Sequence, residues 1–169
     1  MLNPGATEAE LEAAERSHNL RLPPSYREFL RASSGLRLPA YCRFVSCSEV
    51  IAYPQANPSG YEALLEYRED VPSPPNDEYF VYGTEQDGFC IRPEYAASAL
   101  ALNGPAPGSF VASKEFGWVL LVREVSFPGG EHEIWEHDSW SNRRFTSFAD
   151  YFASARVAII ESLRSVGAP

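Results

Sequence analysis

Residues 20–38 read LRLPPSYREFLRASSGLRL and hold the strongest local signals for the fold. Pro23 and Pro24 predict a helix start, because a proline near the first helical position gives up no hydrogen bond that the helix would otherwise make. Gly35 predicts a left-handed turn at the end of this helix. Helical spacing places four residues on one buried stripe: Tyr26, Phe29, Leu30 and Ser33. A helix this short is stable only when packed, so the stretch indicates a core on one side of it.

The residues before this stretch predict another helix. Thr7 and Glu10 have the spacing of a capping box, in which each side chain bonds the backbone of the other residue. We expect a helix from about residue 8 to residue 18, with Asn19 as its left-handed end. Two short helices that meet at a tight corner therefore open the chain.

Further along the chain, the hydrophobic period changes to that of strands. The expected elements are a strand within 38–50, a loop over 53–60, a helix over 61–70, a hairpin with strands 79–82 and 89–91, a strand over 116–126, a turn at 127–130, a strand over 132–137 and a C-terminal helix opened by Ser147. Residues 96–109, rich in Ala, Gly and Pro, are expected to form a surface insertion loop. This order predicts one α+β domain over residues 1–169 with a mainly antiparallel sheet, two N-terminal helices, one middle helix and a C-terminal helix.

Length and composition predict a soluble, cytoplasmic protein. A chain of 169 residues buries roughly 70% of its unfolded surface and needs neither a metal nor disulfides. Its longest strictly apolar run, residues 118–122, is far shorter than the ~20 residues of a membrane span. No basic segment followed by an apolar one opens the chain, so no secretory signal is expected. Three cysteines without a C-x-x-C pair favour reduced thiols over a disulfide framework or a zinc site.

Acidic residues are concentrated in the middle of the chain, which has a net charge of −9. Residues 58–100 hold nine acids against two bases, Arg68 and Arg92. Nucleic acid is therefore not an expected partner, because phosphate binding requires a surplus of Lys and Arg. The candidate partner-binding residues are Glu62, Glu66, Glu69, Asp70, Asp77, Glu78, Glu85 and Asp87. The alternative is a solvated acidic face that only keeps the protein soluble.

The segment His132–His137, HEIWEH, is the strongest candidate for chemistry and does not fit a known site. Its second histidine is at i+5, whereas the zinc-protease pattern needs i+4 on a helix. In a strand the two histidines face opposite sides, so no metal or other cofactor is expected. We expect Trp135 to pack inward and the glutamates at 131, 133 and 136 to be exposed hairpin charge. A small hydrolase that uses His132, Glu136 or His137 remains an alternative.

Residues 7–35, TEAELEAAERSHNLRLPPSYREFLRASSG, resemble the N-terminal signature of the SUKH superfamily (Smi/Knr-type domains). The residues that match this signature are Leu22, Pro23, Tyr26, Phe29, Leu30 and Gly35. Residues 79–91, 133–138 and 144–152 are similar to its central turn segment, its late Trp-containing strand and the start of its closing helix. The turn at Gly83–Gly88, GTEQDG, and residues 96–109 depart from the family pattern.

The resemblance implies a non-enzymatic binding domain with no catalytic residues. Many bacterial members are immunity proteins that neutralise a cognate polymorphic toxin, often a nuclease, and other members are regulatory interaction modules. We hypothesise an immunity protein whose acidic surface occludes the active site of a toxin, with a regulatory scaffold as the alternative. We expect a monomer or a weak homodimer, because an uncovered sheet edge can pair two copies.

Overall fold

Eight short strands and six α-helices form the framework of the described part of the chain. A computed structural model describes residues 3–37, 42–105, 117–138 and 142–167. The helices are α1 (Glu8–His18), α2 (Pro24–Ala32), α3 (Tyr53–Ala56), α4 (Pro58–Asp70), α5 (Asn76–Tyr79) and α6 (Phe148–Gly167), with 3₁₀ turns η1 (Gly83–Glu85) and η2 (Pro93–Ala97). The strands are β1 (Leu36–Arg37), β2 (Cys42–Phe44), β3 (Ile51–Ala52), β4 (Leu100–Ala101), β5 (Asn103–Pro105), β6 (Trp118–Ser126), β7 (His132–His137) and β8 (Asn142–Phe145).

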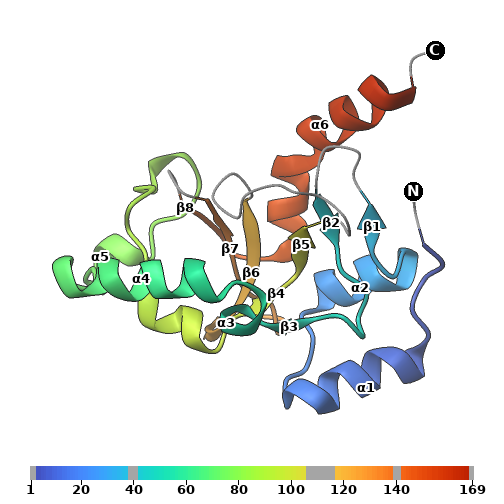
Figure 1. Cartoon of the computed structure of the whole chain (residues 1–169), viewed down its shortest axis with the longest axis horizontal. Coiled ribbons are helices and arrows are strands. Elements are labelled where there is room, and N and C mark those ends of the chain that lie inside the picture. Colours follow the sequence, from blue (N-terminus) through green and yellow to red (C-terminus); the bar gives the residue numbers. More distant parts are fainter. Residues whose placement is uncertain (1–2, 38–41, 106–116, 139–141, 168–169) are drawn as a thin grey trace.

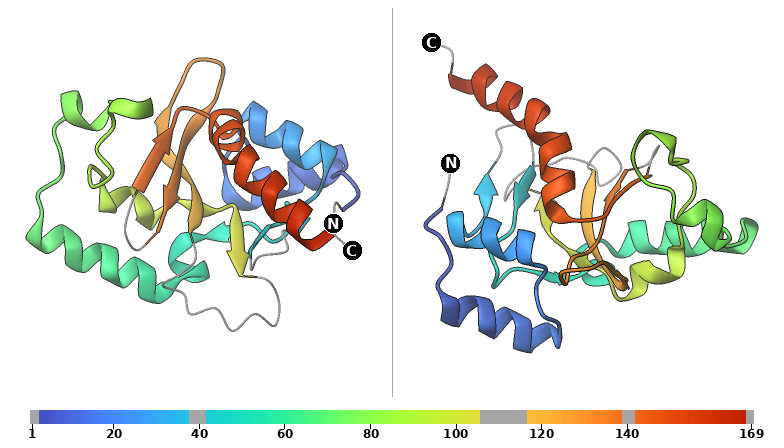
Figure 2. Two further views of the ribbon diagram at one scale, coloured as in Figure 1. Left: turned by 90° about the horizontal axis from the view of Figure 1, so that it is seen from above. Right: turned by 180° about the vertical axis from the view of Figure 1, so that it is seen from behind.

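The strands pair into two antiparallel sheets. One sheet has the order β1-β2-β5, and the larger one has the order β3-β4-β6-β7-β8. Helices α1, α2 and α6 lie on one side of the larger sheet, and α3, α4 and α5 lie on the other (Figures 1 and 2). The predicted α+β class with a mainly antiparallel sheet is confirmed.

Strand β6 is buried on both faces of the larger sheet. Val119 and Leu121 belong to the core beneath α1, α2 and α6. Leu120 and Val122 belong to a second core beneath α3 and α4. Successive residues of a strand point to opposite faces, so a strand covered on both sides reads as an unbroken apolar run. The run at residues 118–122 therefore reports a central strand.

The first core is built on aromatic rings from helices that are far apart in the sequence. Tyr26 of α2 meets Phe148 of α6 edge to face at 4.9 Å between ring centroids, and Phe29 lies 5.1 Å from the same ring. Phe44 of β2 approaches Phe148 at 5.9 Å. The predicted stripe is confirmed, because Tyr26, Leu30 and Ser33 are buried and Phe29 packs against the core. The stretch that opened the sequence analysis thus docks α2 onto the C-terminal helix.

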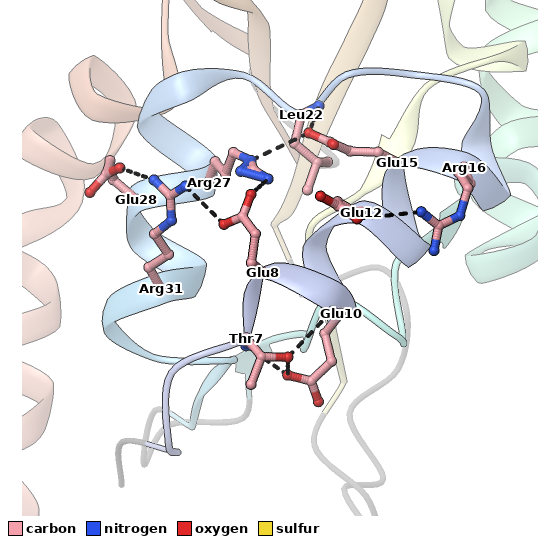
Figure 3. A network of polar contacts seen from close by, with 10 residues as sticks. All are labelled: Thr7, Glu8, Glu10, Glu12, Glu15, Arg16, Leu22, Arg27, Glu28 and Arg31. Atoms are coloured by element: carbon pink, nitrogen blue, oxygen red, sulfur yellow. Dashed lines mark hydrogen bonds and ion pairs between the residues drawn. The ribbon is translucent and has the colours of Figure 1, made fainter.

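Ion pairs orient α2 against α1 (Figure 3). Arg27 pairs with Glu8 and, at 3.5 Å, with Glu15, while Arg31 pairs with Glu8 at 3.0 Å. Hydrogen bonding to Arg31 holds the pKa of the Glu8 carboxyl below its ordinary value. The pair of Arg31 with Glu8 is exposed and adds little free energy, whereas Arg27 and Glu15 are largely buried. Together these pairs link α2 to α1, and Leu11 and Ala14 of α1 pack in the same core as α2.

The predicted ends of α1 and α2 are confirmed, except for the position of Gly35. Thr7 and Glu10 form the complete capping box, and Asn19 ends α1 with a φ of 47°. Helix α2 begins at Pro24 and ends at Ala32. Gly35 has a φ of 92°, but it lies in the turn to β1 and not at the last helical turn. A Cβ at Gly35 would lie 2.9 Å from the Phe44 carbonyl oxygen, so the position also needs glycine for space.

The loop predicted over residues 53–60 is wrong. These residues form α3 and the first turn of α4. Pro54 and Pro58 stand in the first turns of these helices, where proline is favoured. The Asn57 side chain accepts a hydrogen bond from the Gly60 amide at 3.2 Å and so caps α4. Proline and asparagine residues that are typical of loops begin helices in this segment.

The hairpin predicted over residues 79–91 is also wrong. Residues Asn76–Tyr79 form α5, Gly83–Glu85 form η1, and residues 89–91 belong to no strand. The aromatic residues at 79 and 82 satisfied a strand pattern, but their hydroxyl groups reach a buried carboxylate of β7. Tertiary hydrogen bonds override the local propensity in this segment.

The surface loop predicted over residues 96–109 is wrong for the residues that the structure describes. Residues 96–105 include part of η2, β4 and β5, whereas 106–109 lie outside the described residues. Ala96 and Ala99 are fully buried, and Ala101 is 2% exposed. The small residues allow this segment to pass close to β6. In residues 96–105, a composition typical of loops therefore reflects dense packing.

No helix among the described residues is long and apolar enough to cross a membrane.

The aromatic cluster predicts a large loss of stability for Phe148→Ala. Removing a fully buried ring from a rigid core costs about 3–5 kcal/mol of unfolding free energy. Chemical denaturation followed by tryptophan fluorescence measures it. Phe89→Ala is the matched control, because Phe89 is 66% exposed and its loss is expected to cost less than about 0.5 kcal/mol. Similar losses in the two variants would contradict the assignment of this core.

Candidate functional site

The predicted acidic residues lie on the helical layer that is farther from α1 and α2 (Figure 1). We call residues 58–92 the acidic lobe; it comprises α4, α5, η1 and the segments that join them. Six of the candidate residues are exposed there: Glu62, Glu66, Asp77, Glu78, Glu85 and Asp87. Glu69 and Asp70 end α4, and their side chains lie outside the described part of the structure. The fold thus gathers on one lobe acids that come from separate elements.

One of the two bases in the acidic lobe is occupied by internal contacts. The Arg92 guanidinium donates to the Pro74 carbonyl oxygen at 2.9 Å, to Asn76 Oδ1 at 2.6 Å and to the Tyr95 hydroxyl at 2.9 Å. It also stacks over the Tyr79 ring at 4.5 Å from the centroid. Arg92 therefore fixes α5 against η2, and the exposed face of the lobe is strongly negative.

Hydrogen bonds to an edge strand fasten the loop of the acidic lobe that carries Glu85 and Asp87. Strand β8 ends the larger sheet, and its outer side faces this loop. The Gln86 side-chain amide accepts from the Arg144 amide at 2.6 Å and donates to the Arg144 carbonyl oxygen at 3.3 Å. The Gly88 carbonyl oxygen accepts from the Asn142 amide at 2.9 Å. The loop therefore covers the β8 edge of the larger sheet, whose other edge strand is β3.

A polar cluster inside the second core holds the acidic lobe to the sheet. Glu133 of β7 is fully buried and accepts hydrogen bonds from Tyr79 Oη at 2.5 Å, Tyr82 Oη at 2.7 Å and Trp135 Nε1 at 2.9 Å. Arg144 of β8 is fully buried as well. It donates to the backbone oxygens of Tyr79 and, at 3.2 Å, Val81. One cluster thus holds both ends of the Tyr79–Tyr82 segment.

The exposed position predicted for Glu133 is wrong, and the sequence contained the signal to correct it. Trp135 was correctly expected to pack inward, and it is fully buried. Residue 133 has the same strand phase as residue 135 and must point to the same face. Two tyrosines in the preceding segment supply the donors that a buried carboxylate requires.

Burial raises the pKa of Glu133, against the hydrogen bonds from Tyr79, Tyr82 and Trp135 that lower it. Burial also raises the pKa of Tyr79 and of Tyr82, and the nearby Glu133 carboxyl adds to both shifts. Both tyrosines therefore stay protonated at neutral pH and act as donors. This arrangement is that of a structural hydrogen-bond network.

The residues of the hydrolase alternative are not brought together. His132 and Glu136 share a strand face but are separated by roughly 13 Å of strand. Glu136 pairs with Arg143 at 2.9 Å, and His137 bonds Asn142 on the other face of the sheet. Within the described ranges, no three His, Cys, Asp or Glu side chains are placed to hold a metal ion.

A surface groove of about 450 Å³ beside α2 is the remaining hollow of interest, and His132 lines it. Arg27 and Arg31 also line this groove. Both guanidinium groups already pair with glutamates of α1 or α2. Arg21 lines the groove as well, is exposed and forms no ion pair among the described contacts, so the groove keeps one uncompensated positive charge. Glu131, at the neighbouring hairpin, accepts from the Ser25 amide at 2.9 Å and so caps α2.

The geometry defines an α+β domain whose antiparallel sheet lies between two helical layers, one of which presents a negative surface. The sequence matches the SMI1 / KNR4 family (SUKH-1) over residues 5–154, and the chain belongs to this family. No significant match to a curated protein was found. The family comprises immunity and regulatory modules and is in general non-enzymatic, and it implies a protein partner.

The buried carboxyl predicts a pH dependence that Glu133→Gln removes. Because the folded-state pKa of Glu133 is raised, the folded protein holds this proton after the unfolded chain has released it. This contribution to stability is fully present below the unfolded pKa and is lost as the pH rises through the folded pKa. We expect the unfolding free energy of the wild type, minus that of E133Q, to fall as the pH increases above about 4.3.

Denaturant titrations of both proteins at a series of pH values measure this difference. Taking the difference cancels the other carboxyl groups, which the two proteins share. A difference that grows with pH would mean that the hydrogen bonds outweigh burial.

The attachment of the loop to β8 predicts faster hydrogen exchange in Gln86→Ala. The variant loses the acceptor for the Arg144 amide, and a net loss of about 1 kcal/mol corresponds to roughly fivefold to tenfold faster exchange. Exchange at Arg144, measured by NMR, tests the contact. Gln86→Glu is the matched control, because it retains the acceptor oxygen. Unchanged exchange at Arg144 in Q86A would contradict the attachment.

Proposed function

We propose that this chain is an immunity protein that binds a cognate polymorphic toxin and occludes its active site with the acidic lobe. The observation that carries the proposal is the charge of the lobe. Six of its acids are exposed, and one of its two bases is engaged internally. Family membership supports a binding module of the immunity or regulatory kind.

A nuclease toxin is the partner that best fits this charge. A nuclease binds phosphates, so its active-site groove is rich in Lys and Arg. An acidic surface that enters this groove competes with nucleic acid for the same cations. Complementary charge also accelerates the encounter of the two proteins. We place this encounter in the cytoplasm, where the toxin would meet its substrate.

Neutralisation of a toxin separates this proposal from a regulatory scaffold. The toxin encoded beside the gene for this chain is co-expressed with and without the chain, and cell survival is counted. We expect survival only when the chain is present. Survival that does not depend on the chain would favour the regulatory alternative.

The electrostatic part of the proposal predicts slower association for the triple variant Glu62→Lys, Glu66→Lys and Glu85→Lys. These three acids are exposed and make no hydrogen bond outside their own segment among the described contacts, so their reversal spares the fold. We expect association with the toxin to slow by about tenfold or more at low salt and to lose most of its dependence on ionic strength. Stopped-flow fluorescence or surface plasmon resonance measures both quantities.

The matched control reverses three acids outside the lobe: Glu12, Glu28 and Glu124, all exposed. It changes the net charge by the same amount. Because these acids contact Arg16, Arg31 and Ser98, thermal melting first establishes that the control variant is folded. Equal association rates in the two triple variants would refute a role for the acidic lobe in steering.

A further inference from the structure

The acidic lobe exposes apolar side chains among its charges. Five large apolar residues of the described chain are more than a third exposed: Ile51, Val71, Phe80, Phe89 and Ile160. Three of them, Val71, Phe80 and Phe89, belong to the acidic lobe. Phe89 has the largest exposed fraction, 66%, and Phe80 follows at 44%. An apolar group in water costs free energy, so this concentration requires an explanation.

The exposure of Phe89 is imposed by a fixed backbone. The Phe89 amide donates to Asp87 Oδ1 at 2.8 Å, and its carbonyl oxygen accepts from the Tyr67 hydroxyl at 3.4 Å. The preceding Gly88 is bonded to β8, and the following Cys90 is buried. The ring therefore points outward from a segment that is anchored on both sides. Such preorganisation lowers the entropy cost of binding.

The charge around Phe89 limits what covers it. A second copy would bring another acidic lobe, and like charges repel. Nucleic acid and anionic membrane surfaces are disfavoured for the same reason. A protein surface with a basic rim and an apolar centre is complementary to both properties of the lobe.

We propose that Phe89 is the apolar anchor of the toxin-binding surface, inserted into an apolar pocket that lies within a basic rim on the toxin. This inference rests on the proposed function. Exposed charges mainly set the association rate, whereas affinity comes from a few buried anchors, among which aromatic residues are enriched. The acids and Phe89 thus have separable kinetic roles. Phe80 is a second exposed ring of the lobe, and its centroid lies 5.6 Å from the Arg92 guanidinium.

Dissociation kinetics test the anchor. The toxin domain encoded beside the gene is purified and immobilised, and binding of the wild type, Phe89→Ser and Phe89→Leu is followed by surface plasmon resonance. We expect F89S to dissociate about thirtyfold faster or more, with an association rate within about threefold of the wild type. F89L keeps an apolar group and is expected to lie between the two. Ile51→Ser is the matched control, because Ile51 is 41% exposed and lies outside the lobe.

Each outcome separates the anchor from the proposed function. Thermal melting first establishes that F89S is folded, which its exposure leads us to expect. Wild-type binding with equal dissociation rates for F89S and I51S would overturn the anchor and leave the immunity function standing. A wild type that does not bind this toxin would overturn both. Self-association of the wild type that F89S abolishes, seen by analytical ultracentrifugation, would assign the anchor to a second copy and overturn its assignment to a toxin.

Discussion

Burial of the β6–β7 pair on both faces is the constraint on which the rest of the structure depends. Leu121 and Ile134 face the first core, and Leu120 and Trp135 face the second. A strand pair that is apolar on both sides needs a helical layer on each side. The first layer comes from the N-terminal and C-terminal helices, which meet through the rings of Tyr26 and Phe148. The second comes from the middle of the chain, so the acidic segment has to fold back over the sheet.

Local signals predicted the elements whose ends are set by nearby residues. The capping box at Thr7, the stripe through Tyr26 and the two strands that flank residues 127–130 depend on contacts within a few positions, and all are present. The middle of the chain was predicted poorly because its structure depends on distant partners. Tyr79 and Tyr82 have the composition of a strand, yet Glu133 of β7 binds their hydroxyl groups more than 50 positions away. The alanine-rich composition near residue 100 is typical of a loop. The burial of these residues depends on their packing against β6.

The candidate surface was predictable in charge but not in form. Counting acids located the negative segment, and exposure of such residues is the common case. The outward ring of Phe89 was not predictable, since residues 89–91 fit a buried strand. Its exposure follows from the hydrogen bonds of Gln86 and Gly88 to β8. No residue spacing in the sequence predicts these hydrogen bonds. The buried position of Glu133 was within reach, because the phase of Trp135 implies it.

The residues of the polar cluster in the second core hold the fold together, and different residues form the exposed surface of the acidic lobe. Glu133 and Arg144 bind the hydroxyl and backbone groups of the Tyr79–Tyr82 segment, and Gln86 binds the backbone of β8. Three exposed acids of the acidic lobe take no part in these hydrogen bonds: Glu62, Glu66 and Glu85. Substitutions at these exposed positions therefore alter charge without loosening helix α4, which carries Glu62 and Glu66, or the loop that carries Glu85. The residues that set the shape of this surface therefore differ from those that set its charge.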